Sequence, residues 1–141
     1  MEYKFEVRNT NDNDYKELLT WWKYHRFKAP PFHILPDDKS QGLMVSYNGV
    51  NLCAGFVYRT SSSALFWTEF IVSNFTTRDR EIRKQGLIFL INGLNYMAKE
   101  MGAEIIYTSV ISPSLMKRYL DCGYIEGSKD ALEMIKIIKS E

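Results

Sequence analysis

One continuous stretch, residues 64–102, constrains the fold of this chain more than any other. Residues 64–72 are mostly aromatic and β-branched, which is typical of a strand. A basic turn follows, and then a helix is predicted over about residues 86–101, ended by Gly102. The helix prediction rests on apolar residues at the three- and four-residue spacing of one helix face: Leu87, Leu90, Ile91, Leu94, Ala98 and Met101.

The turn between this strand and this helix is a candidate anion site. Its basic residues outnumber its acidic ones and are Arg78, Arg80, Arg83 and Lys84. A helix N-terminus adds unpaired amides and the positive end of the helix dipole, which together favour a bound phosphate. The alternative is an ordinary solvated basic loop.

The start of this helix has two interpretations. In the second, Thr77 or Asp79 is the N-cap, and Gly86 then lies inside the helix. The amide cradle would shift to residues 74–79, and Arg80 and Arg83 would reach a phosphate from the side of the helix.

Length and composition exclude several classes of protein. The 141 residues predict one domain, and 18 basic against 17 acidic residues argue against nucleic-acid binding by bulk charge. Cys53 and Cys122 have no metal-like spacing with His25 or His33, so we expect two free thiols, a reducing compartment and no metal. Apolar runs are too short to span a bilayer, and we expect a soluble intracellular protein.

Before the central stretch, the pattern predicts a strand over residues 3–8 and a helix over residues 14–27. Strands over residues 43–47 and 50–59 are joined by Asn48-Gly49, a strong hairpin signal, and Gly55 indicates a bulge or close backbone approach.

After the central helix, residues 103–111 predict a strand buried on both faces and parallel to residues 64–72. A short helix to Cys122 follows, with Ser112 as its cap, and residues 124–126 and 131–139 predict a last antiparallel pair. The fold class is therefore α+β, with a mostly antiparallel sheet of about seven strands, one parallel pair and helices on both faces.

This order of elements is similar to the fold of the GNAT superfamily of acyl-CoA N-acyltransferases over essentially the whole chain. The segment Arg83-Lys84-Gln85-Gly86-Leu87-Ile88 resembles the family's Q/R-x-x-G-x-G/A loop. Residues 112–124 resemble its N-x-x-A-x-x-L-Y-E-K-x-G-F segment, with Tyr119, Gly123 and Tyr124 on the Tyr, Gly and Phe. Residues 67–74 and the longer loop after them resemble GNAT variants of tailed phages.

The resemblance implies transfer of an acetyl group from acetyl-CoA to an amine by direct attack. It places the pantetheine arm between two splayed strands, with a main-chain amide near Ile71, Val72 or Ser73 polarising the thioester carbonyl. The remaining coenzyme A contacts would come from Arg78, Arg80, Arg83, Lys84, Gln85, Gly86 and Ser112, the last replacing the family's Asn. Residues that would close over the acceptor amine, a small molecule or a protein, are Trp21, Phe32 and His33.

Glu69 and Tyr119 are the candidates for proton transfer. Glu69 is an acidic residue in an apolar strand, where partial burial would raise its pKa and suit it to act as the base. Tyr119 matches the family's acid position, and its phenol could protonate the leaving thiolate. Alternatively, Glu69 faces solvent or pairs with an Arg, and Tyr119 only packs the short helix.

A second function remains open, namely a non-catalytic GNAT-like binding protein with a degenerate coenzyme A site. Ile88, where the family has a second small residue, and the lengthened turn favour it. In either case we expect a monomer or homodimer, no nucleic acid and no membrane partner, and a location in the cytoplasm of a bacterial cell, including a phage-infected one.

Overall fold

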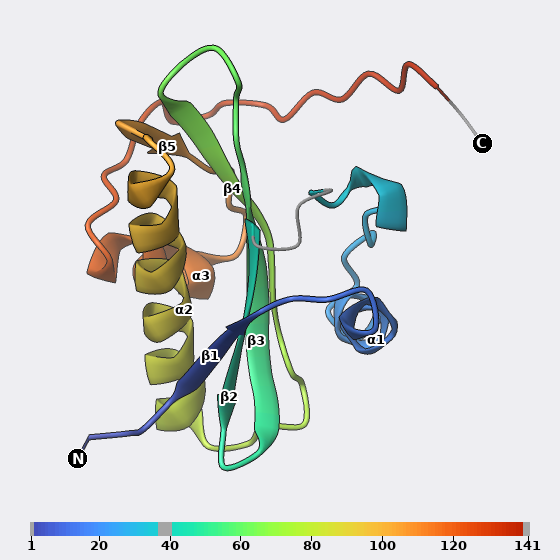
Figure 1. Ribbon diagram of the computed structural model, residues 1–141, viewed down its shortest axis with the longest axis vertical. Coiled ribbons are helices and arrows are strands. Elements are labelled where there is room, and N and C mark those ends of the chain that lie inside the picture. The colour runs from blue at the N-terminus through green and yellow to red at the C-terminus, as the bar shows by residue number, and fades with distance from the viewer. Residues whose placement is uncertain (1, 37–40, 140–141) are drawn as a thin grey trace.

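In the computed structural model the chain folds into a five-stranded sheet with helices on both faces (Figure 1). The structure describes residues 2–36 and 41–139. Its strands lie in the order β1 (Glu6–Asn9), β2 (Gly42–Tyr47), β3 (Val50–Tyr58), β4 (Leu65–Ser73) and β5 (Ile105–Tyr107). Each of β1 to β4 is antiparallel to the next of these four strands, and β5 runs parallel to β4. The predicted α+β class and its single parallel pair are confirmed.

The β2–β3 hairpin forms as predicted. Asn48 and Gly49 both have positive φ, 51° and 80°, which is the geometry of a two-residue type I′ turn. The turn makes β2 and β3 antiparallel neighbours in the sheet.

Helices cover the two faces unequally. Helix α1 (Asp14–Tyr24) and the 3₁₀ turn η1 (Phe32–Ile34) lie on one face, while α2 (Arg80–Glu100) and α3 (Pro113–Asp121) lie on the other (Figure 1). Helix α1 ends three residues before the predicted residue 27, because Arg26 turns into the left-handed region with φ of 57°. No helix in the described part of the chain is long and apolar enough to cross a membrane.

Each face of the sheet has its own apolar core. Under α2 the buried residues are Leu43, Val45, Leu52, Cys53, Val57, Phe66, Leu90, Leu94 and Ala98. Under α1 they are Leu18, Trp21, Trp22, Leu35, Met44, Ala54, Phe56 and Val72. Burying a large side chain of this kind contributes roughly 1.5–3 kcal/mol, so the central strands are held from both sides.

Helix α2 begins at Arg80, so the prediction of a start near residue 86 is wrong and the alternative with Asp79 as N-cap is correct. The Asp79 carboxylate accepts from the amides of Glu81 and Ile82 over 3.0 and 3.1 Å, which fixes the first turn. Gly86 is buried within the helix, where a Cβ would come to 3.1 Å from Leu52 Cδ1. The glycine therefore permits close packing of α2 on β3.

The C-terminal third differs most from the prediction. Strand β5 has three residues instead of nine, and its Ile105 and Tyr107 side chains are 56% and 52% exposed instead of buried. The predicted pair of strands over residues 124–126 and 131–139 is absent from the described residues, so the sheet has five strands and not seven. A strand needs a neighbour for its amides and carbonyls, and these segments have none within the described single chain.

Candidate functional site

Strands β4 and β5 pair only briefly and then separate. Their parallel pairing covers Leu65–Ile105, Phe66–Ile106 and Trp67–Tyr107, whereas β4 continues to Ser73. At the point of separation, the Thr108 hydroxyl donates to the Thr68 carbonyl over 2.7 Å, where a backbone amide would continue the ladder. The edge of β4 beyond Trp67 is thus open to other partners.

A bulge lies in this open part of β4. The register pairs Phe56 with Glu69 and Ala54 with Val72, so two residues of β4 oppose Gly55 alone. The glycine is required there, because a Cβ would meet Ile71 Cγ1 at 2.7 Å. The bulge predicted from Gly55 is confirmed.

Phe70 is the strained residue of the bulge. Its φ of 61° is rare for a bulky side chain, and such outliers cluster at functional sites. The ring is held by edge-to-face contacts with Trp22, Phe27 and Tyr58, at centroid distances of 6.4, 6.3 and 6.0 Å. The core under α1 therefore fixes the backbone between Glu69 and Ile71.

Glu69 lies half-buried beside the point of separation. The Ser109 amide donates to Glu69 Oε1 over 3.2 Å. Burial raises the pKa of the Glu69 carboxyl above its ordinary 4.5, the Ser109 bond opposes this, and the nearby Glu133 carboxylate adds to the rise. The partial burial expected for Glu69 is confirmed, and its role as a base stays a prediction.

Tyr119 approaches the same point from α3. It is buried, and its hydroxyl is hydrogen-bonded to Thr108 Oγ1 at 3.2 Å. Burial, with smaller contributions from Tyr124 and Glu69, holds the pKa of the phenol well above its usual range. The phenol is consequently neutral at pH 7 and retains a proton to donate.

Two consecutive residues after β5 contact the two candidate catalytic side chains. Ser109 is hydrogen-bonded to Glu69, and Thr108 is hydrogen-bonded to Tyr119. The sequence did not predict a role for Thr108 or Ser109, because a serine or threonine after a strand matches no motif. The arrangement places a carboxylate with a raised pKa and a neutral phenol at one gap in the sheet.

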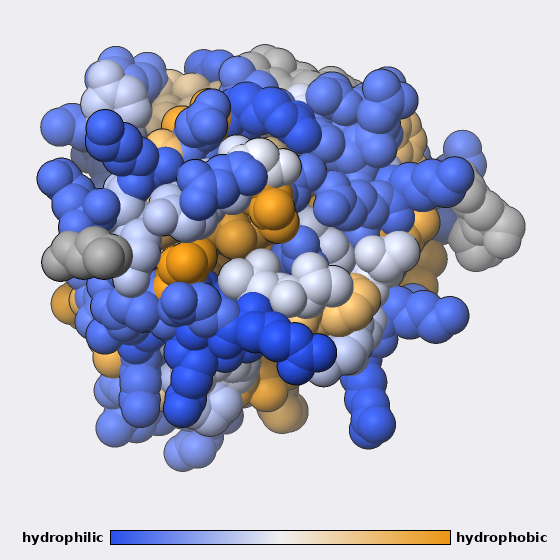
Figure 2. Space-filling model, turned by 90° about the horizontal axis from the view of Figure 1, so that it is seen from below, coloured by the Kyte–Doolittle hydropathy of each residue, from blue (hydrophilic) through white to orange (hydrophobic). Residues whose placement is uncertain are grey.

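The basic residues gather at the end of the molecule where α2 begins. Figure 2 looks onto this end, which is mostly hydrophilic around a small apolar area. Arg78, Arg80, Arg83 and Lys84 are exposed and, among the described residues, form no ion pair. They lie as expected for an anion site, although the Asp79 carboxylate already binds two of the amides of this helix end.

The remaining residues predicted for coenzyme A lie in different places. Gln85 is within α2 and donates to Glu81 Oε1 over 3.2 Å, and Gly86 is covered by Leu52, so neither is part of a loop. The Ser112 hydroxyl caps α3 by accepting from the Leu115 amide, as predicted for the helix start. Ser73, at the end of β4, presents its carbonyl to His25 Nε2 at 3.0 Å.

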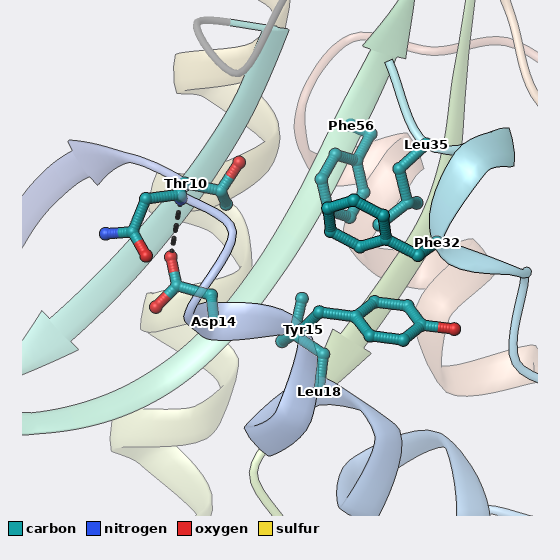
Figure 3. Close-up of a pocket in the computed structure, with 8 residues that line it drawn as sticks. Thr10, Asp14, Tyr15, Leu18, Phe32, Leu35 and Phe56 are labelled. Atoms are coloured by element: carbon teal, nitrogen blue, oxygen red, sulfur yellow. Dashed lines mark hydrogen bonds between the residues drawn. The ribbon is translucent and has the colours of Figure 1, made fainter. Parts of the chain in front are cut away.

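The three residues predicted for the acceptor are not gathered together. Trp21 is buried in the core under α1, whereas Phe32 and His33 are exposed on η1. Phe32 lines a small hollow beside α1, shown in Figure 3, and packs edge to face on Tyr15 at 5.2 Å. Glu69 and Tyr119 do not line this hollow.

No protein-family model and no curated protein matches the sequence. Solved structures do match the fold. N-acetylglutamate synthase from Neisseria gonorrhoeae, complexed with coenzyme A and L-arginine, aligns with 94% of this chain at a TM-score of 0.68 and 11% identity. This chain spans only 30% of that synthase.

Two further solved structures align along their full lengths. An aminoglycoside N-acetyltransferase in complex with CoA aligns at a TM-score of 0.59 and 15% identity, covering 97% of this chain and 98% of the other. A protein described as a transcriptional regulator, from Bacillus halodurans, gives 0.67 and 15%, covering 94% and 100%. At these identities the similarity shows the fold alone, and that fold is the GNAT fold.

Proposed function

We propose that this protein is an acyl-CoA-dependent N-acyltransferase that moves an acetyl group from acetyl-CoA to an amine by direct attack. The observation that carries the proposal is the gap between β4 and β5, where Ser109 and Thr108 hold Glu69 and Tyr119. A carboxylate with a raised pKa and a neutral phenol are the pair that amine acylation needs.

The residues present fit a long donor that ends in phosphates. The open edge of β4 from Glu69 to Ser73 offers main-chain groups for the amides of a pantetheine arm, and the Phe70 bulge interrupts the regular ladder there. Beyond Ser73, the exposed Arg78, Arg80 and Arg83 supply positive charge at the N-terminus of α2. In acetyl-CoA, the thioester supplies the activated acyl group.

Proton movements follow from the positions of the two side chains. In its ionised form, Glu69 takes a proton from the attacking amine at its carboxylate. Tyr119 gives its phenolic proton to the departing sulfur, and burial keeps that proton in place until it is needed. Main-chain amides at the bulge stabilise charge on the carbonyl oxygen during attack.

A second function, that of a non-catalytic binding protein, is favoured by one observation. The Asp79 carboxylate bonds to the amides of Glu81 and Ile82, where a pyrophosphate would otherwise bind. The GNAT fold by itself does not decide between the two, since fold and activity are separable.

Thermal unfolding with and without acetyl-CoA separates these functions, with coenzyme A and ADP as comparison ligands. A ligand at 100 times its dissociation constant stabilises the folded state by about 2.7 kcal/mol, which raises the unfolding midpoint measurably. We expect acetyl-CoA and coenzyme A to raise the midpoint more than ADP does. No change at millimolar acetyl-CoA would instead support the binding protein.

A further inference from the structure

The Ser73 carbonyl lies on the open edge of β4. The Asn74 amide donates to the Leu52 carbonyl of β3 over 2.7 Å, so this N–H points toward β3. The Asn74 N–H and the Ser73 carbonyl belong to one planar trans peptide unit, in which the two groups point in opposite directions. The Ser73 carbonyl therefore points away from β3, toward the side on which β4 is unpaired beyond Trp67 in the described residues.

A side chain from the end of α1 already occupies this carbonyl. His25 Nε2 lies 3.0 Å from the Ser73 oxygen, in a contact exposed to solvent. A carbonyl oxygen can only accept, so Nε2 carries the proton and the imidazole is the donor. The two residues are 48 positions apart in the sequence, so the fold and not the local chain brings them together.

The main chain at the end of α1 fixes the position from which the imidazole extends. The Phe27 amide donates to the Trp22 carbonyl over 3.0 Å, and the Arg26 amide donates to the Lys23 carbonyl over 3.1 Å. With Arg26 in the left-handed region, these two bonds form a Schellman motif in which His25 is the helix C-cap. The Cα of His25 is thus held by main-chain bonds that do not involve its side chain.

Aromatic contacts hold the same end of α1 against the second half of β4 and the loop after it. Tyr24 stacks on Phe75 with ring centroids 4.3 Å apart, and Phe27 packs edge to face on Phe70 at 6.3 Å. The imidazole of His25 packs edge to face on Tyr24 at 5.3 Å. These contacts keep His25 beside β4, so its bond to the carbonyl can break and form again by a turn of the side chain alone.

A second side chain occupies a main-chain carbonyl further back on β4. The Thr68 carbonyl accepts from the Thr108 hydroxyl over 2.7 Å in a partly buried contact, and Thr108 is also bonded to Tyr119. The His25 contact to Ser73 is exposed instead, and water can replace either partner of an exposed hydrogen bond at little cost. Of the two contacts, the one made by His25 is therefore the one that a ligand can displace.

We propose that His25 competes with the donor molecule for the Ser73 carbonyl and so acts as a gate on the open edge of β4. The inference rests on the proposed function, in which this edge holds the pantetheine arm of acetyl-CoA. In the free protein the imidazole donates to the carbonyl, and an amide N–H of the arm takes its place on binding. The observed affinity is then reduced by the fraction of molecules in which the gate is open.

Calorimetric titration of acetyl-CoA into wild type and into His25→Ala tests the gate. The net contribution of a neutral hydrogen bond corresponds to a factor of about two to ten, so His25→Ala should bind acetyl-CoA more tightly by that factor. ADP, which lacks the arm, should have the same affinity for both proteins. Lys28→Ala, which removes another exposed side chain after α1, is the matched control and should bind acetyl-CoA as wild type does.

Binding rates show whether His25 acts before the complex forms or within it. A gate acts before binding, so stopped-flow measurements should show faster association of acetyl-CoA with His25→Ala. The dissociation rate should be unchanged, because His25 no longer contacts Ser73 in the complex. An unchanged unfolding midpoint in the absence of ligand should show that the variant is folded.

Equal affinities of wild type and His25→Ala for acetyl-CoA would overturn the gate and leave the proposed function standing. Weaker binding by the variant, or a gain that comes from slower dissociation, would overturn it too, since His25 would then act within the complex. A matching gain for ADP or in Lys28→Ala would show that the effect does not pass through the arm. Absent binding of acetyl-CoA to both proteins would overturn the proposed function together with the gate.

Discussion

The backbone amide of Ser109 donates a hydrogen bond to Oε1 of Glu69 over 3.2 Å, across the gap where β5 leaves β4. This bond fixes the carboxylate at the gap without neutralising it. The Glu69 pKa remains raised, since burial outweighs the bond. Glu69 is thus held as a base with more affinity for a proton than an exposed carboxylate has.

Glu69→Gln should lower kcat for acetyl transfer by about 100-fold or more, the usual contribution of a general base. The glutamine can still accept from Ser109, so acetyl-CoA binding should persist. Thiol release from acetyl-CoA, followed across a panel of amines, measures the effect. Wild-type turnover in this variant would remove Glu69 from the mechanism.

Wild-type activity should fall as the pH decreases through the raised pKa of Glu69, because the base acts only when ionised.

The effect of Glu69→Gln on stability has a predictable sign as well. Folding disfavours the ionised carboxylate, and this cost is present above the raised pKa and absent below the ordinary 4.5. Glu69→Gln should therefore be more stable than wild type at neutral pH, with the difference vanishing near pH 4, as measured by urea unfolding.

Tyr119→Phe should lower kcat while acetyl-CoA affinity is unchanged, because only the acid is removed. Thr108 keeps its 2.7 Å bond to the Thr68 carbonyl, so the free energy of unfolding should change by about 1.5 kcal/mol or less. Tyr124→Phe is the matched control, since it removes a neighbouring phenol that is half-buried and donates to Asn95 instead. Equal losses of kcat in the two variants would assign Tyr119 a packing role.

Asp79→Asn should raise the affinity for coenzyme A. Asparagine caps a helix about as well as aspartate, so α2 should keep its start while the negative charge beside the phosphates is removed. Asp79→Ala loses the cap as well and should destabilise the protein by about 1 kcal/mol. Calorimetric titration and thermal unfolding measure the two effects, and an unchanged affinity in Asp79→Asn would show that phosphates do not bind at this helix end.

Gly86→Ala distinguishes packing from phosphate binding. In the structure its added methyl group meets Leu52 at 3.1 Å, in the second turn of the helix and on the side packed against β3. We expect a change in stability with coenzyme A affinity preserved. A loss of affinity without a loss of stability would restore Gly86 to the binding loop.

Local signals predicted the parts of the fold that depend on neighbouring residues. Asn48-Gly49 determined the hairpin and Ser112 the start of α3, because a turn and a cap need only their own segment. The predicted start of α2 was wrong because the residues around Gly86 resemble a loop motif, whereas Asp79 provides the stronger capping signal.

Residues of the candidate site were predicted only where a single residue or a local motif indicated them. An acidic residue within an apolar strand indicated Glu69, and a motif match indicated Tyr119. Thr108 and Ser109 depend on how far β5 follows β4, which no local pattern encodes. Residues 131–139 carry a strand pattern, but pairing needs a neighbour that the described single chain does not supply.

The central claim is that the gap beside β4 and the basic end of α2 hold acetyl-CoA. Its most direct test is calorimetric titration of acetyl-CoA into the wild-type protein and into the double variant Arg80→Glu with Arg83→Glu. The matched control is the double variant Lys16→Glu with Lys99→Glu, which reverses the charge of two exposed side chains away from the start of α2. The account predicts saturable binding of one molecule per chain in wild type and control, lost in the arginine variant without a change in its unfolding midpoint. Absent binding in wild type, or equal affinity in the arginine variant, would contradict it.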